Sequence, residues 1–308
     1  MGACNTKIED NEPEEEELQP VPKAAPKKIM VFAVMRNGHE GIRGILATIA
    51  ELADAFVAEP NSENALALQG AWRDFLACLK IHMAVEEDIF FPLLNKNFDS
   101  VTTKEGLSKE HDDDAVSNVK ASALVDAAVA NPNAETAAAV KDVLDQYRQG
   151  HIAHLEHEEK VMMPLTRKIN PPSMRPAIVN RILMHDFEQY KFFIAVNVRE
   201  MAKRNPFNSF RMLCLAFQRS LTAEQYSEVI PIIKANSGAL WDKLVEAGID
   251  GPGTLTQKEI DDCAAANIIP QKAKTAEPKA QPKKIMVFAV MRNGHEGIRG
   301  ILATIAEL

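Results

Sequence analysis

Apolar residues recur at every third or fourth position along four long stretches of the chain. This spacing places them on one helix face and predicts four amphipathic α-helices. The expected helices span residues 29–56, 63–94, 103–129 and 135–168. Short polar breaks follow the first and third of them. Long amphipathic helices joined in this way predict an all-α fold built on an up-down four-helix bundle.

Further helices are expected towards the C-terminus, over residues 175–203, 210–218 and 222–233. Thr222 and Gln225 have the spacing of a capping box, which marks the start of the last one. These additional C-terminal helices are expected to pack outside the bundle or against one of its ends. Together with the bundle they form one predicted domain over residues 26–250.

The segments on either side of this domain differ from it in composition. Residues 1–25 are acidic and end in prolines, which is typical of a disordered tail. Residues 251–281 are rich in Pro, Lys and Ala, so we interpret them mostly as a linker, with a short helix expected over 256–266.

The last part of the chain repeats the first helix. Residues 22–52 recur as 278–308 with one difference, Ala25 against Gln281. We interpret residues 282–308 as the first helix of an incomplete second repeat, with His295 in the place of His39. A lone amphipathic helix exposes an apolar stripe, so it must pack on the bundle or mediate self-association.

Polar residues on the four apolar faces indicate the chemistry. Each of the four helices places one histidine there, and two of the histidines are followed four residues later by a glutamate. Residues four apart share a helix face, so each such pair reaches one small volume on the bundle axis. Burying such groups costs several kcal/mol unless they find partners. The candidate metal ligands are His39, His82, Glu86, His111, His154 and Glu158.

Four histidines and two glutamates account for most of the coordination sphere of a two-metal site. Two octahedral ions need about twelve positions, and imidazole with carboxylate suits iron, manganese or zinc. If both glutamates and one oxide or hydroxide bridge, about two positions stay open for a small ligand.

The two His-Glu pairs also share their flanks. His82 and His154 each begin the pattern H-x-x-x-E-E, followed by mainly apolar residues and Pro-Leu. This order of motifs resembles the hemerythrin-like HHE cation-binding domain family, in the variant with two H-x-x-x-E pairs, over about residues 28–170. The resemblance implies two iron ions, oxo- or hydroxo-bridged, held by the six residues named above.

Other polar residues lie near the motifs. His151, one turn before His154, and His185 are candidates for an orienting role or as further ligands. Glu87 and Glu159 are expected to face solvent or to orient the histidines. We interpret Asp112 to Asp114 as a solvated acidic face.

Composition and charge limit the classes of partner and the compartment expected for the protein. The formal net charge of −8 excludes nucleic acid as a main partner, because phosphate binding needs a basic surface. Four widely spaced cysteines favour a reducing, cytoplasmic compartment. The N-terminus fits the myristoylation pattern at Gly2, and Cys4 nearby could be palmitoylated. Two interpretations are therefore open: membrane anchoring by acylation, and a chance match to a short pattern.

Three functions are compatible with such a site. The first is a non-heme di-iron protein that binds or senses a small diatomic ligand, oxygen or nitric oxide, or iron itself. The second is a di-iron enzyme acting on peroxide or nitric oxide. The third is iron storage or repair. No motif for an organic substrate pocket is present in the sequence, which favours the first.

Overall fold

A computed structural model of the chain describes residues 31–169 and 173–266. Within these ranges every regular element is a helix, which confirms the predicted all-α fold. The acidic tail, Gly2, Cys4, residues 267–281 of the expected linker and the second repeat with His295 lie outside the described residues. In the described part of the chain, no helix has the length and hydropathy needed to cross a membrane.

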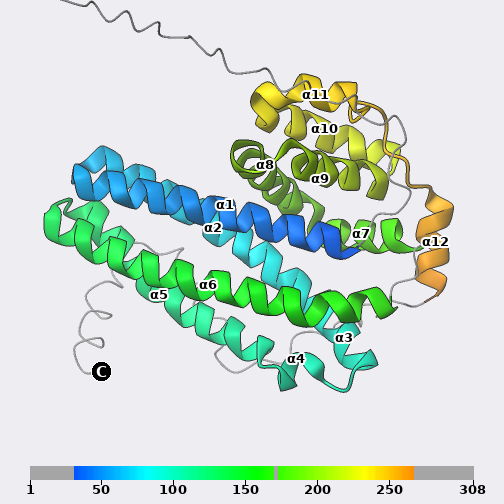
Figure 1. The fold of residues 1–308 in the computed structure, drawn as a ribbon, viewed down its shortest axis with the longest axis horizontal. Coiled ribbons are helices and arrows are strands. Elements are labelled where there is room, and N and C mark those ends of the chain that lie inside the picture. The colour runs from blue at the N-terminus through cyan, green and yellow to red at the C-terminus, as the bar shows by residue number, and fades with distance from the viewer. Residues whose placement is uncertain (1–30, 170–172, 267–308) are drawn as a thin grey trace, which may run out of the picture.

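Four long helices form the bundle (Figure 1). Helix α1 packs against α2 and α6, and α5 packs against the same two helices. Short connections after α1 and α5 reverse the chain direction, and the side chains of Asn61 and Asn133 cap the helices that follow. The bundle helices are α1 (Val31–Ala58), α2 (Ser62–Val85), α5 (Leu107–Ala130) and α6 (Ala134–Ile169).

The second expected helix is interrupted, so the prediction of one regular helix over 63–94 is wrong in this detail. Helix α2 is followed by one π-helical turn, η1 (Glu86–Phe90), and by α3 (Phe91–Asn97). The Phe91 N–H donates to the Glu86 carbonyl five residues back. Pro92 lacks an N–H, and the wider turn leaves room for its ring.

The third expected helix also begins later than predicted. A short helix α4 (Val101–Lys104) comes first, and α5 begins at Leu107 rather than at residue 103. Asp99 and Ser100 have positive φ angles of 47° and 56°, and Gly106 has 82°. These left-handed residues turn the chain twice before α5 can start.

Helices after residue 170 form a second layer on the α1–α2 side of the bundle, away from α5 (Figure 1). The expected helix over 175–203 is broken by a 3-10 turn at Met184–Asp186, and the Asp186 carboxylate caps the next helix. The capping box of Thr222 and Gln225 is present as predicted. The layer consists of α7 (Arg175–Leu183), α8 (Phe187–Arg204), α9 (Phe207–Ser220), α10 (Ala223–Ser237) and α11 (Trp241–Glu246).

Glycines on α1 bring this layer into close contact with the bundle. A Cβ atom on Gly41 would lie 1.7 Å from the Asn197 Oδ1, and one on Gly44 would lie 2.7 Å from the Glu200 Cβ. Only a glycine face lets α8 approach α1 so closely. The second layer therefore packs directly on the helix that carries His39.

A last helix, α12 (Gln257–Ala265), lies within the segment expected as a linker and packs against α7. A second capping box, Thr256 with Glu259, starts it. The side chains of Leu255 and Cys263 are buried.

Candidate metal centre

The bundle brings the six predicted ligands together in its interior. His39 comes from α1 and His111 from α5. His82 lies near the end of α2 with Glu86 at the start of η1, and His154 and Glu158 lie in α6. All six are buried, with exposed fractions between 0% for Glu158 and 8% for His82. Helical periodicity explains this, because each residue lies on the apolar stripe of its helix.

Their side chains form two groups that share one carboxylate. The first group contains His39, His82, Glu86 and Glu158, and the second contains His111, His154 and Glu158. In each group the candidate ligand atoms all lie within 4.8 Å of one another. Glu158 thus lies between two candidate ion positions, where a bridging carboxylate would be.

The distances inside the cluster support this arrangement. Each paired histidine faces its own glutamate, with 3.2 Å from His82 Nε2 to Glu86 Oε2 and 3.3 Å from His154 Nε2 to Glu158 Oε1. The His111 Nε2 lies 3.5 Å from both Glu86 Oε2 and Glu158 Oε1. Glu86 therefore also faces the second group, although its main contacts are in the first.

The polar atoms at the centre have no hydrogen-bond partner among the described residues. This holds for the Nε2 atoms of His39, His82 and His111 and for both carboxylate oxygens of Glu86 and Glu158. Buried polar groups are nearly always paired, since each unpaired one costs about 1–3 kcal/mol. A set of converging lone pairs is what bound cations would satisfy.

In three of these histidines the other ring nitrogen, Nδ1, is hydrogen-bonded to a carboxylate. The Nδ1 atoms of His39, His111 and His154 lie 3.0, 2.8 and 2.7 Å from Glu159, Glu87 and Glu110. Such bonds fix the orientation of a metal-binding histidine and turn its Nε2 towards the ion. Glu87 and Glu159 thus orient histidines, which was one of the two roles expected for them.

The comparison with protein families agrees with this geometry. The family model described as hemerythrin HHE cation binding domain matches residues 30–166. Residues 30–166 form a hemerythrin HHE cation-binding domain. No curated protein and no solved structure matches the chain. The second layer, from α7 onwards, lies beyond the part of the chain that the HHE model matches.

The second glutamate of each E-E motif in the HHE domain reaches a neighbouring helix. Glu159 of α6 orients His39 of α1, and Glu87 of the π turn orients His111 of α5. Arg43 holds Glu159 through a contact of 2.8 Å and bonds Glu40 at 2.9 Å. Glu87, in contrast, is 49% exposed and has no such arginine among the described residues.

Two carboxylates of the HHE domain were missed by the sequence-based interpretation. Glu110 accepts hydrogen bonds from both His154 and His157. Asp114, expected in a solvated acidic face, binds the His151 Nδ1 at 2.7 Å. Both lie one turn or less from His111 on α5, and this proximity is the only signal for them in the sequence.

The two further histidine candidates lie outside both ligand groups. His151 is fully buried beside His154, with ring centroids 5.6 Å apart, and its Nε2 has no partner among the described residues. Its place next to a ligand favours an orienting or packing role. His185 instead pairs with Asp88, with 2.9 Å between Nε2 and Oδ2.

The pKa of His82 is shifted in the opposite direction from the pKa values of His39 and His111. Burial lowers the pKa of His82 to about 3, which keeps this imidazole neutral. Burial also opposes the charged forms of His39 and His111, but the surrounding carboxylates outweigh it and raise their pKa values to about 9 and about 12. Burial and the neighbouring Glu86 raise the pKa of Glu158, whereas the nearby histidines hold the pKa of Glu86 well below its usual value, against the effect of burial.

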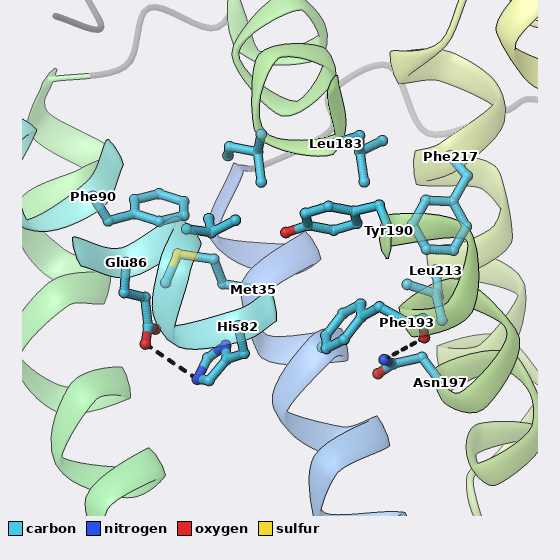
Figure 2. A pocket seen from close by; sticks show the side chains of 13 residues that line it. Met35, His82, Glu86, Phe90, Leu183, Tyr190, Phe193, Asn197, Leu213 and Phe217 are labelled. Carbon is cyan, nitrogen blue, oxygen red and sulfur yellow. Dashed lines mark hydrogen bonds and ion pairs between the residues drawn. The ribbon is translucent and has the colours of Figure 1, made fainter. Parts of the chain in front are cut away.

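A small cavity lies beside the first ligand group (Figure 2). His82 and Glu86 line one side of it, and residues of α7, α8 and α9 line the other. Its volume is about 40 Å³. A cavity needs roughly 10–15 Å³ to hold one water, so this one has room for a diatomic molecule or a few waters.

Proposed function

We propose that the HHE domain holds two iron ions and that this di-iron centre binds a small ligand, so that the protein acts as a binding or sensing protein. The supporting observation is the set of buried, unpaired imidazole and carboxylate atoms that converge between four helices. The donors are nitrogen and oxygen only, and no described cysteine belongs to either group. Such a donor set suits iron and disfavours thiolate-loving ions.

In this proposal, each residue of the cluster has a defined task. The four histidines would hold the ions through their Nε2 atoms, two in each group, and Glu158, which belongs to both groups, would be shared. Glu86 completes the first group. Glu87, Glu110 and Glu159 hold three of the histidines in the required orientation. A bound di-iron centre supplies open coordination positions and one-electron chemistry at iron.

Metal occupancy is expected to change the stability of the bundle. The ligands come from all four helices, so an ion that binds only the folded state stabilises their packing by mass action. This coupling gives the protein a way to report iron or a ligand of iron.

The size of the cavity favours a small ligand over an organic substrate. Pockets for organic molecules are usually about 300–1,000 Å³, against about 40 Å³ here. An enzyme acting on peroxide or nitric oxide is the second candidate, because these molecules also fit.

Metal analysis with visible absorption tests the proposal. The purified full chain should hold about two irons and show an oxo-bridge band, following the count of coordination positions. His82→Ala should lose metal, and His185→Ala, outside both groups, should keep it. Zinc alone, or equal metal in wild type and His82→Ala, would contradict the proposal. Turnover of added hydrogen peroxide or nitric oxide by the iron-loaded protein would favour the enzyme.

A further inference from the structure

The cavity beside the cluster of candidate metal ligands is built by two parts of the chain. Its inner wall belongs to the HHE domain, where His82 and Glu86 face it. Its outer wall is made by Leu183 of α7, Tyr190 and Phe193 of α8, and Leu213 of α9. These residues lie beyond residue 166, where the match to the HHE family model ends. The second layer thus closes one side of the centre.

The chemistry of this outer wall selects the kind of molecule that the cavity takes. Leucine and phenylalanine side chains line most of it, so a charged ligand would lose its hydration without compensation. The volume of about 40 Å³ excludes all but the smallest molecules. An uncharged diatomic gas meets both conditions.

Two polar side chains of the outer wall line the cavity, Tyr190 and Asn197, and the Asn197 amide already donates to the Phe193 carbonyl. Figure 2 shows the Tyr190 hydroxyl pointing from α8 into the cavity, towards the side of Met35 and Glu86. Tyr190 is only 6% exposed. Burial and the charge of Glu86 raise the pKa of Tyr190, so the hydroxyl keeps its proton and can donate it.

We propose that helices α7–α9 form the ligand chamber of the metal centre, in which an uncharged diatomic molecule occupies the cavity beside His82 and Glu86 and accepts a hydrogen bond from Tyr190. The proposal rests on the proposed function for the identity of the ligand, but not for the existence of the chamber. It gives the second layer a role in access to the centre and in retention of the ligand.

Xenon tests the chamber without any metal. We expect crystals of the metal-free full chain under xenon pressure to bind one xenon atom between Leu213 and Tyr190, since apolar cavities of this kind accept it. Leu213→Trp should fill the cavity and abolish this site. Met212→Trp, one residue along α9 and outside the cavity lining, is the matched control. A cavity without xenon in the wild type would overturn the proposal.

Nitric oxide tests the chamber in the iron-loaded protein. Stopped-flow absorption should show that Leu213→Trp slows the combination of nitric oxide with the ferrous protein at least about tenfold, because the indole ring would occupy the cavity. Tyr190→Phe should leave combination nearly unchanged and speed dissociation about two- to tenfold, the effect of one hydrogen bond. Unchanged rates in both variants would contradict the proposal.

The two proposals fail in different ways. If the protein holds zinc or no metal but xenon occupies the cavity, the di-iron function fails and the chamber stands. If the protein holds two irons, but substitutions at Leu213 and Tyr190 change neither xenon occupancy nor the rates of nitric oxide binding, the chamber fails and the di-iron function stands.

Discussion

Two segments of the bundle carry the same motif with the same spacing, His82 to Pro92 and His154 to Pro164. In the first, the backbone widens into a π turn at Glu86–Phe90, whereas α6 continues as a regular helix through Pro164. Glu86 belongs to one ligand group and lines the cavity, but Glu158 belongs to both groups. Equivalent positions in sequence therefore have different roles in the site.

The difference comes from what surrounds each segment. The π turn leads into α3 and α4, which have to turn the chain before α5, while α6 spans the bundle without interruption. The cavity also lies on the Glu86 side alone, because α7–α9 pack there. The motif predicts ligands, and the neighbouring helices decide what each ligand does.

The largest expected effect is a difference in iron content between variants of Glu158 and Glu86. Glu158→Ala should lower iron content from about two per chain to near zero, because it removes a donor from both groups. Glu86→Ala should leave about one iron, held by the second group. Plasma mass spectrometry of the purified variants measures this. Equal losses would show that both glutamates bridge.

Protonation should distinguish His39, whose pKa is raised, from His82, whose pKa is lowered. Carboxylates raise the pKa of His39 from 6.5 to about 9 despite its burial, so its charge stabilises the metal-free fold below about pH 6.5. This stabilisation, up to about 3 kcal/mol, should be lost as pH rises through about 9. Urea unfolding of the metal-free protein at several pH values measures it.

Metal binding should show the opposite trend. An ion needs deprotonated His39 and His111 nitrogens, so affinity should increase with pH and uptake should release protons. Titration with ferrous iron in weakly buffered solution measures the release. His82 should contribute none, because the pKa of this residue is lowered to about 3. Metal uptake without proton release would contradict this picture.

Replacing the two orienting carboxylates of the motifs should weaken metal binding to different extents. Glu159→Gln should weaken metal binding about tenfold to a hundredfold, the usual range for such groups. Glu87→Gln should fall at the lower end, because Glu87 is 49% exposed and no described arginine holds it. Competition with a chelator of known affinity compares them, with Glu156→Gln, at an exposed position of α6, as the control. A larger loss for Glu87→Gln would reverse this ranking.

The smallest effect concerns the two prolines, which are both exposed. Pro164→Ala should stabilise the protein by about 1 kcal/mol or more, because it restores an N–H within a regular helix. Pro92→Ala should be nearly neutral, since the Phe91 bond to Glu86 has already widened the helix there. Thermal unfolding of the two variants checks this. Equal shifts would mean that the π turn does not arise from Pro92.

Much of the site was predictable from the sequence. The positions of His39, His82, His111 and His154 on apolar helix faces follow from periodicity, and so do those of Glu86 and Glu158. Glu110 and Asp114 were not predicted as orienting groups, because their partners His154 and His151 are on another helix. The cavity was not predicted either, because its outer wall comes from segments far from the motifs.

The sequence alone determined which residues face the bundle interior, because a helix repeats every 3.6 residues and the motif spacing follows that repeat. Tertiary structure alone decided that Glu158 is shared between two groups, that the chain widens after His82, and that Tyr190 faces the centre. The physical reason is the range of the interactions. Periodicity acts within one helix, whereas a shared ligand or a closed cavity depends on how separate helices pack.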